Sequence, residues 1–378
     1  MPVTIVTGDL GTDTINQSQR VIDIDDKITA LEPNAAPLTV LTKKLKKRVA
    51  IGPKVEWLES QPMPRFDTLS ASAASNATAL PVTNGNYFRV GDVLRLEAGD
   101  AAEVTATAAG AVTAVRAIGT VTAASAANAS EVFIVSNVNS EGACLREIKT
   151  PKLDNAYNYT QIVRTPFGIT GTEAATKLYG GPDRRRLQAE TGIEHMRQWE
   201  QIALTGARRE DTTTAGKPKR FSGGMVEFCT SNVTSVGGTL TEAAFLTFLR
   251  TGFRYGGGRK ILLASPLVIN AIEGFARTNI QVTNDRASTY GIEMKTYVSG
   301  QGTVDLVMER WLQDSVAYRG HAFLVDLDNV FYAPLRDTKL LEDRQPNDCD
   351  RIEDEYLTEA SFVFAQERTH AIMKGVTG

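Results

Sequence analysis

PDRRRLQAETGIEHMRQWEQIALT, residues 182–205, is the longest uninterrupted helical pattern in the sequence. Pro182 suits a first helical turn, because its missing N–H would have no partner there. Apolar side chains recur at spacings of three and four and predict one buried face: Ala189, Ile193, Met196, Ala203 and the neighbouring Leu204. Gly206 can take the left-handed conformation that ends a helix. Taken alone, the pattern also fits a surface helix of an ordinary globular domain, so the flanking sequence has to decide.

The composition is that of an ordinary folded protein. The chain has 378 residues, a length that is enough for two or three domains. Of these residues 42% are hydrophobic and 22% are charged, as is usual for a folded protein. A net charge of −3 does not indicate a nucleic-acid or membrane binder, and no apolar run approaches the roughly 20 residues that span a bilayer. Cys144, Cys229 and Cys349 are far apart and odd in number, so neither a disulfide framework nor a CxxC metal site is predicted. The N-terminus shows no secretory signal, and a reducing cytoplasm is the expected setting.

The N-terminal segment is weakly patterned. Residues 1–26 read as an extended arm that needs a partner surface to become ordered. Asp25 or Asp26 can cap a short helix that runs to Leu31. After Pro33 breaks the chain, a second helix is expected from Pro37, with Leu38, Leu41 and Leu45 on one face.

A basic cluster ends this second helix, and it consists of Lys43, Lys44, Lys46, Lys47 and Arg48. Three interpretations remain open for it. It can be a solvated helix face, an ion-paired contact to another subunit, or a contact to phosphate groups.

Residues 54–164 read as one long excursion from the main body. The segment 53–70 is extended and contains three prolines. From residue 80 to residue 137, short Val, Ile and Thr runs alternate with turn residues, which predicts a small all-β module. The Ala/Ser/Thr-rich runs at 71–79 and 122–130 are its expected loops.

The remainder reads as a mixture of strands and helices. Residues 158–171 alternate as a strand does, and 207–220 form a polar loop. Thr239 and Glu242 have capping-box spacing for a helix that ends at Gly256–Gly258. A buried strand at 261–264 and a helix that Ser265 caps follow. Further strands come next, and Phe362 and Phe364, in period two, indicate a closing β-hairpin arm.

Motifs for catalysis or cofactor binding are absent from the sequence. It contains no HExxH, GxSxG or GxGxxG. AGKPK around Lys217 has proline where a phosphate loop needs Ser or Thr, and GGGRK at 256–260 has the reverse order of elements. His195, His321 and His370 are not tied by spacing to a nucleophile or to a metal. We therefore predict no catalytic, cofactor or metal site, and a protein that is not an enzyme.

The order of arm, β excursion, long helix, α/β region and closing strands resembles the major capsid proteins of tailed bacteriophages. These share the Hong Kong 97-like α+β fold, and the subgroup with a β domain inserted in the extended loop is most similar. Six segments carry the resemblance: LEPNAAPLTVLTKKL, VEWLESQPMPRFDTL, YFRVGDVLRL, EQIALTGARRE with SGGM, LTEAAFLTFLRTGFRYGGGRKILLASPLVINAI, and EYLTEASFVFAQERTHAIMKGVTG. Their order matches the family over nearly the whole chain.

The resemblance implies five regions. Residues 1–52 would be an N-terminal arm, and 53–172 an extended loop with a β domain inserted at about 82–137. The spine helix and exit loop of a peripheral domain would occupy 173–224, an axial domain 225–326, and closing peripheral strands 327–378. An arm and a long loop are costly to order in a lone subunit, at about 1–2 kcal/mol per residue, so neighbouring copies are expected to bury them.

The implied function is self-assembly into hexamers and pentamers of an icosahedral shell that encloses phage genomic DNA. The expected partners are other copies, portal and scaffolding proteins, and double-stranded DNA on the inner face, with a decoration protein as an optional addition and no membrane. The scaffold is expected to be a separate protein, because the chain begins directly with the arm. The protein would belong to the virion and be assembled in the host cytoplasm. The predicted inter-subunit contacts are Lys43, Lys44, Lys46, Lys47, Arg48, Trp57, Arg65, Phe66, Arg184 and Arg185.

Two alternatives stay open at this point. One is the shell protein of an encapsulin-like nanocompartment, and the other is a phage tail or adhesion protein that binds through its β insert. Covalent cross-linking through Lys54, which lies in the predicted extended loop, is not expected, because no matching catalytic acid is recognisable by motif.

Overall fold

The computed structural model describes residues 36–45, 47–144, 146–176, 182–214, 216–275 and 295–377. The chain divides into two compact units. The main unit comprises Met1–Trp57 and Tyr157–Gly378, and the insert comprises Leu58–Ala156. The arm predicted at 1–26, with the short helix to Leu31, lies outside the described residues.

The long helix forms where the sequence predicts it, as α3, Asp183–Thr205. Pro182 is its N-cap, with φ −67° and ψ 121°, and not its first helical residue. Gly206 ends the helix at φ −58° and ψ 146°, so the expected left-handed stop is wrong. Glycine is required there for another reason: a Cβ atom would lie 2.4 Å from the Ser222 carbonyl oxygen and 2.6 Å from that of Ile202.

The buried face of α3 differs from the predicted apolar stripe. Ala189 is exposed, and Ile193 and Met196 are only partly buried. The side chains that are buried are His195, Trp199, Glu200, Ala203 and Leu204. Apolar periodicity misses this face because two of its members are polar and are satisfied by partners on distant segments.

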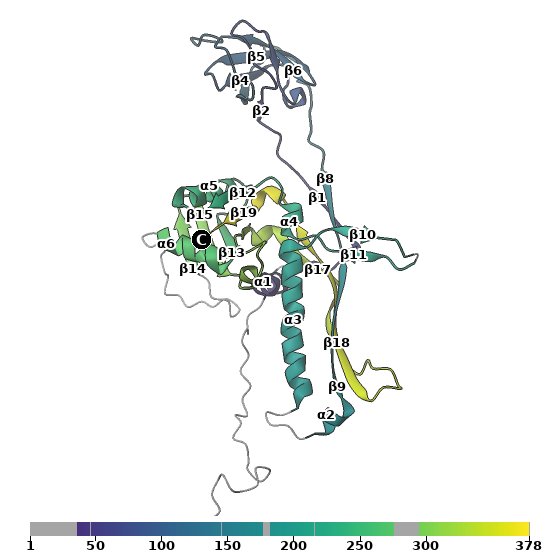
Figure 1. The fold of residues 1–378 in the computed structure, drawn as a ribbon. Helices are drawn as coiled ribbons and strands as arrows, with labels where there is room; N and C mark the ends of the chain where they lie inside the picture. Colours follow the sequence, from purple (N-terminus) through teal and green to yellow (C-terminus); the bar gives the residue numbers. More distant parts are fainter. Residues whose placement is uncertain are drawn as a thin grey trace, which may run out of the picture. The chain divides into compact units, whose positions relative to one another are not determined.

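A three-stranded antiparallel sheet runs along α3 (Figure 1). Its order is β17 (Val330–Leu341), β18 (Arg351–Phe364) and β9 (Gln161–Thr170). Trp199 packs against the rings of Tyr332 and Phe362, at centroid distances of 6.4 and 6.0 Å. The short helix α1, Pro37–Leu45, lies against α3 and β17 and buries Leu38 and Leu41, as predicted.

A six-stranded mixed sheet forms the rest of the main unit. Its order is β12 (Val233–Gly238), β19 (Ala371–Val376), β16 (Ala322–Val325), β13 (Arg259–Ala264), β15 (Gly302–Met308) and β14 (Lys295–Ser299). The associated helices are α4 (Met225–Phe228), α5 (Glu242–Gly252), α6 (Pro266–Phe275) and α7 (Trp311–Asp314). Strand β13 is buried on both faces, since Ile261 and Leu263 join the core around Trp199 while Leu262 and Ala264 pack with α5 and α6.

Helix boundaries in this region follow local capping. Ser265 caps α6 as predicted, and its Oγ accepts from the Val268 N–H at 3.3 Å. The cap of α5 is Thr241, whose side chain accepts from the Ala244 N–H at 3.3 Å, so the predicted Thr239 box is wrong. Helix α5 also ends at Gly252, before the glycine run.

Two predictions of connectivity are wrong. The predicted polar loop at 207–220 contains two short paired strands, β10 (Arg209–Asp211) and β11 (Lys219–Phe221). The predicted closing strand is present as β18, but β19 does not pair with it. After a turn in which Gln366 has φ 56°, β19 enters the six-stranded sheet between β12 and β16. The last strand therefore belongs with the region predicted at 225–326.

The insert is a β module around a six-stranded sheet. The strand order is β2 (Phe66–Thr68), β7 (Glu131–Asn137), β4 (Asp92–Leu96), β5 (Ala101–Ala108), β6 (Ala111–Arg116) and β3 (Ala79–Pro81). One face is covered by loops and buries Leu80, Phe88, Leu94 and Val132. The sheet begins at residue 66 and not at about 82, because β2 and β3 are too short to show a period.

The remaining elements are short. Strands β1 (Lys54–Glu59) and β8 (Asp154–Tyr159) pair as a two-stranded sheet where the chain leaves and re-enters the main unit. Helix α2, Gly171–Ala175, precedes α3. Within the described ranges no helix is long and apolar enough to cross a membrane.

Candidate functional site

Helix α1 is held on α3 by a buried carboxylate. Glu200 is fully buried, and its two oxygens accept the N–H groups of Leu38 and Thr39 at 2.8 and 2.7 Å. The Thr39 hydroxyl donates to the same side chain at 2.6 Å. These are the first N–H groups of α1, which have no partner inside the helix, so Glu200 acts as a cap supplied by another element.

A chain of hydrogen bonds continues beneath α3. His195 is buried between the Thr165 hydroxyl on β9, at 2.8 Å from Nδ1, and the Thr358 hydroxyl on β18, at 2.7 Å from Nε2. Thr358 donates to the Thr338 hydroxyl at 2.8 Å, which also receives the ammonium group of Lys43 at 3.0 Å. Burial, and secondly the charge of Lys43, lower the pKa of His195 to about 4. The network joins all three strands and α1 to α3.

The described members of the basic cluster point in different directions. Lys43 is partly buried over the Tyr332 ring, 5.0 Å from its centroid, and burial lowers the pKa of its ammonium group to about 8. Lys47 forms an ion pair with Asp337. Arg48 donates to the Glu56 carbonyl at 3.2 Å and is otherwise exposed. Lys46 and the side chain of Lys44 lie outside the described residues.

The predicted arginines at the start of α3 have different surroundings. Arg184 donates to both oxygens of Asp354 on β18, at 2.7 and 2.8 Å. Arg185, next to it, is exposed. Only Arg185 thus presents its charge to solvent, whereas Arg184 is used to attach the helix to the sheet.

Trp57 lies at the root of the long excursion. It is 7% exposed and packs against Phe228, with ring centroids 5.7 Å apart. Nearby, the Tyr157 ring is flanked by the cations of Lys54 and Arg208, each 4.3 Å from its centroid. Cations over an aromatic face are attracted by its quadrupole, so this cluster fixes the point where the loop leaves the main unit.

Arg65 and Phe66 lie in the insert. Phe66 is 39% exposed on β2 and lies directly opposite Phe133 on β7, which is 42% exposed. Val135, further along β7, is 50% exposed. The open face of the sheet thus carries an apolar strip, beside the exposed Arg65.

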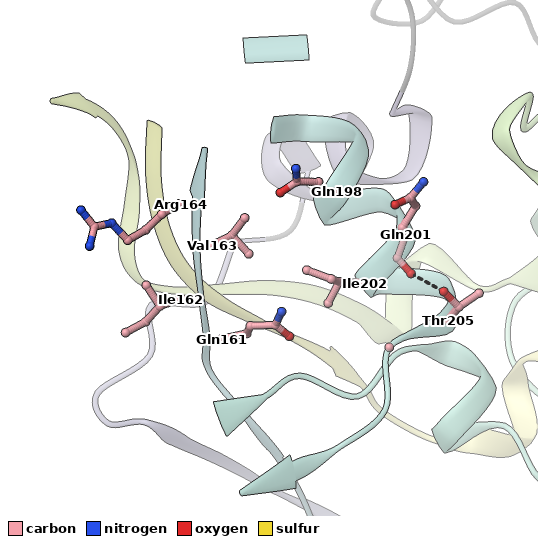
Figure 2. A pocket seen from close by; sticks show the side chains of 9 residues that line it. Gln161, Ile162, Val163, Arg164, Gln198, Gln201, Ile202 and Thr205 are labelled. Carbon is pink, nitrogen blue, oxygen red and sulfur yellow. Dashed lines mark hydrogen bonds between the residues drawn. The ribbon is translucent and has the colours of Figure 1, made fainter. Parts of the chain in front are cut away.

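A groove runs between the start of β9 and the second half of α3 (Figure 2). Its volume is about 450 Å³, and Val163 and Ile202 point towards each other across it, with Gln161, Gln198 and Gln201 supplying amide groups. Ile162 and Arg164 alternate away from α3 (Figure 2). Strand β9 is an edge of its sheet, since β18 is its neighbour on one side only. An edge strand beside an open polar groove is suited to contact with an extended segment of another chain.

The histidines and cysteines do not gather into a reaction centre. His321 packs beside Tyr318 and Phe323, and His370 beside Phe364, both away from His195 and its threonines. Across the described part of the chain no group of three His, Cys, Asp or Glu side chains is placed to hold a metal ion. The described surfaces instead offer contacts: an apolar strip, exposed arginines and an edge groove.

Comparison with known proteins decides the family. The family model described as SU10 major capsid protein matches residues 6–377. The chain belongs to this family. It is accordingly a shell-forming major capsid protein of tailed-phage type, and a component of the virion that associates with copies of itself. No match was found among curated proteins.

Solved structures show that this capsid protein has the Hong Kong 97-like fold. It is similar to the capsid of a native GTA particle, at 8% identity, TM-score 0.53, and coverage of 96% of this chain and 97% of the other. The cyanophage A-1(L) capsid matches at 11% identity, TM-score 0.54, and coverage of 97% and 100%. The structure titled Mycobacterium phage Bobi matches at 10% identity and TM-score 0.52, with coverage of 98% of this chain and 100% of the other. These likenesses confirm the predicted α+β fold.

Sequence reasoning missed Glu200 and Asn158, and it named His195 without its partners Thr165 and Thr358. Asn158 is fully buried and donates to the carbonyls of Gly223 and Phe362, at 3.0 and 2.8 Å, while accepting the Gly223 N–H at 2.8 Å. The one available signal was the presence of polar residues inside strongly periodic segments. Such a residue, if buried, requires a hydrogen-bond partner, so it indicates a polar contact in the core.

Proposed function

We propose that this capsid protein assembles into hexamers and pentamers of an icosahedral shell that encloses double-stranded phage DNA. The family match over residues 6–377 carries the proposal, because it spans both units. The chain is a structural protein, and we propose no catalytic role for it. Assembly would take place in the cytoplasm of the bacterial host, with portal and scaffolding proteins as partners.

The regions would divide the work as follows. The sheet of β12–β16 with β19 and its helices would form the axial domain, at the centre of each ring of subunits. Helix α3 with β9, β17 and β18 would form the peripheral domain. The arm at 1–52 and the loop at 53–172 would contact neighbouring subunits, and double-stranded DNA would lie on the inner face.

Exposed apolar side chains support contact between copies. Next to α1, Val49 and Ile51 are 68% and 101% exposed, and Leu58 on β1 is 67% exposed. Burial of such side chains stabilises an interface by about 25 cal/mol per Å² of apolar surface removed from water. Arg48, Arg65 and Arg185 are exposed and stay predicted inter-subunit contacts, as do Lys44, Lys46, Lys47, Trp57 and Phe66. Lys43, Lys47 and Arg184 already have partners within the chain, and Trp57 is only 7% exposed, which makes these four weaker candidates.

Negative-stain microscopy of the expressed protein tests the proposal. We expect rings of five or six subunits or closed shells, either alone or with a co-expressed scaffolding protein. A monodisperse monomer under both conditions, with residues 53–165 protected from proteolysis, would contradict it. A decoration protein, if there is one, is expected to bind the open face of the insert, which a Phe66→Ser variant would test by loss of binding.

A further inference from the structure

Two hairpins of the main unit carry opposite charges. The first, residues 207–221, contains β10 and β11 and has five basic and two acidic residues, a net charge of +3. The second, residues 342–350, joins β17 to β18 and has four acidic residues and one basic residue, a net charge of −3. We call them the basic hairpin and the acidic hairpin. Since the whole chain carries a net charge of only −3, each hairpin is a local concentration of charge.

Much of the positive charge of the basic hairpin faces solvent. Glu210 offsets one cation, because it forms an ion pair with Arg220 at 2.8 Å. Asp211 lies opposite Lys219 in the pair of β10 and β11 and attracts it over a longer distance. The cations that are exposed and have no ion pair within the described part of the chain are Arg209, Lys217 and Lys219. These three are available to a partner of negative charge.

The acidic hairpin likewise keeps exposed carboxylates. Asp343 lies 3.5 Å from Arg184, and Arg344 lies 3.6 Å from Glu355, so these charges are used within the chain. The carboxylates that are exposed and have no ion pair among the described side chains are Glu342, Asp348 and Asp350. The two hairpins thus present three cations and three anions to solvent.

The two hairpins lie at opposite ends of β9 (Figure 1). At the start of β9, the side-chain oxygen of Gln161 accepts at 3.0 Å from the N–H of Ser222, which directly follows β11. At the other end, Thr170 is paired with Arg351, which directly follows the acidic hairpin. Strand β9 has 10 residues, so about 30 Å separates the bases of the hairpins. This distance exceeds the screening length of about 8 Å at physiological salt, and the two charges therefore do not neutralise each other within one copy.

We propose that the basic hairpin of one copy binds the acidic hairpin of a second copy, head to tail. Complementary charge identifies this occupant, because the phosphate groups of DNA would satisfy the cations and leave the acidic hairpin without a partner. The two surfaces differ, so the contact is heterologous, and contacts of this kind close into rings when the rotation between copies allows it. The inference rests on the proposed assembly and names one of its contacts.

Charge reversal in the full-length subunit tests the contact, with assembly followed by light scattering and microscopy in the absence of DNA. One double variant is Arg209→Glu with Lys217→Glu, and the other is Glu342→Lys with Asp348→Lys. Each should reduce the yield of assembled particles by about tenfold or more, because like charges then meet at every contact. The variant with all four changes should recover to within about twofold of the wild type, since the charges are again complementary. An equal mixture of the two double variants should assemble where neither does alone.

A further variant separates pairing from net charge. Arg209→Glu and Lys217→Glu are combined with Glu131→Lys and Glu141→Lys, two exposed glutamates of the insert. This variant has the net charge of the wild type without a complementary pair of hairpins, so it should remain defective. Because all the altered side chains are exposed, the urea midpoint of each soluble subunit should stay that of the wild type.

Several results would overturn the contact. Either double variant assembling at the yield of the wild type would do so, and this includes the case in which the basic hairpin binds DNA, where empty shells form normally and only packaging is lost. A folded fourfold variant that does not assemble, or a net-charge control that does, would also overturn it. If the wild type forms neither rings nor shells, the proposed function fails and this contact fails with it, whereas a wild type that assembles beside unaffected double variants removes the contact alone.

Discussion

The interior beneath α3 and the interior of the insert differ in the polarity of their buried side chains. Beneath α3, the buried groups include an imidazole, the carboxyl group of Glu200 and a partly buried ammonium group, beside Trp199 and Phe362. The core of the insert consists of Leu, Val, Ala and Phe side chains. All three histidines of the sequence, His195, His321 and His370, belong to the main unit, and none lies in the insert.

Two buried charges of the insert form an ion pair. Arg116 and Asp100 are 5% and 0% exposed at their side chains and lie 2.6 Å apart. Arg116 also donates to the carbonyl of Ala74 at 2.6 Å and to that of Ala124. A guanidinium group stays charged at any pH the protein meets, so this clamp ties three segments together without acting as a switch.

The difference shows where the capsid protein responds to its surroundings. An apolar core with a fixed ion pair depends on size and shape, whereas the network under α3 also depends on protonation. The insert should therefore behave as a rigid module. The contact of α1 and the sheet with α3 should be the adjustable part.

The largest expected effect comes from removing the central aromatic ring under α3. Trp199→Ala leaves a cavity between Tyr332 and Phe362 and should lower the free energy of unfolding by about 3–5 kcal/mol. Phe88→Ala in the insert is the matched variant, since Phe88 is also fully buried and the expected loss is similar. Peptide-resolved hydrogen exchange in denaturant would measure both.

The two variants should act in different places. Trp199→Ala should lower protection within 157–378 and Phe88→Ala within 58–156, in accordance with the two compact units. Equal loss of protection throughout the chain in either variant would show that the two units unfold together. It would contradict the prediction that each unit has a stability of its own.

Acidification should separate the two units next. Burial lowers the pKa values of His195 and His370 to about 4, from an ordinary value of 6.5. The unfolded chain binds these protons first, so the main unit loses stability as pH falls from 6.5, by about 2 kcal/mol for each histidine over about 1.5 pH units. The insert has no histidine and should keep its protection over pH 6.5 to 5. Parallel losses in both units would contradict this account.

A smaller effect is expected at the hydroxyl that links His195 to the sheet. Thr358→Val leaves the Nε2 atom of His195 and the Thr338 hydroxyl without this partner, at a cost of about 1–2 kcal/mol. Thr358→Ser restores the hydroxyl and should recover most of the loss in a urea titration. A Thr358→Val variant as stable as the wild type would show that these hydrogen bonds contribute nothing to stability.

Local signals in the sequence predicted the helices and strands well. Helix α3, the apolar strand β13 and the Ser265 cap of α6 each depend on residues within a few positions, which periodicity and capping rules read directly. The insert was recognised for the same reason, but its first strand was missed, because the three residues of β2 carry no period. The resemblance in segment order then led to the family, which the comparisons confirmed.

Pairing between distant residues could not be predicted. The partner of Glu200 on α1 is 161 positions away, and that of His195 on β18 is 163 positions away. An analysis based on apolar residues alone places such polar groups on the surface. For this reason the predicted buried face of α3 included Ala189, which is exposed. Strand β19 was misplaced on similar grounds, because nothing near Ala371–Val376 shows which sheet it will join.

The smallest expected change in stability lies on the open face of the insert. Phe66 is 39% exposed and lies opposite Phe133, so Phe66→Ser should change the free energy of unfolding by about 0.5 kcal/mol, mainly through the lost pairing with Phe133. The same change removes the apolar strip that we propose as a contact. Fewer assembled particles in microscopy, with unchanged hydrogen exchange in 58–156, would therefore assign Phe66 to assembly. Normal particle yield from this variant would remove Phe66 from the predicted contacts between subunits, because truncation of an interface residue that matters should weaken association.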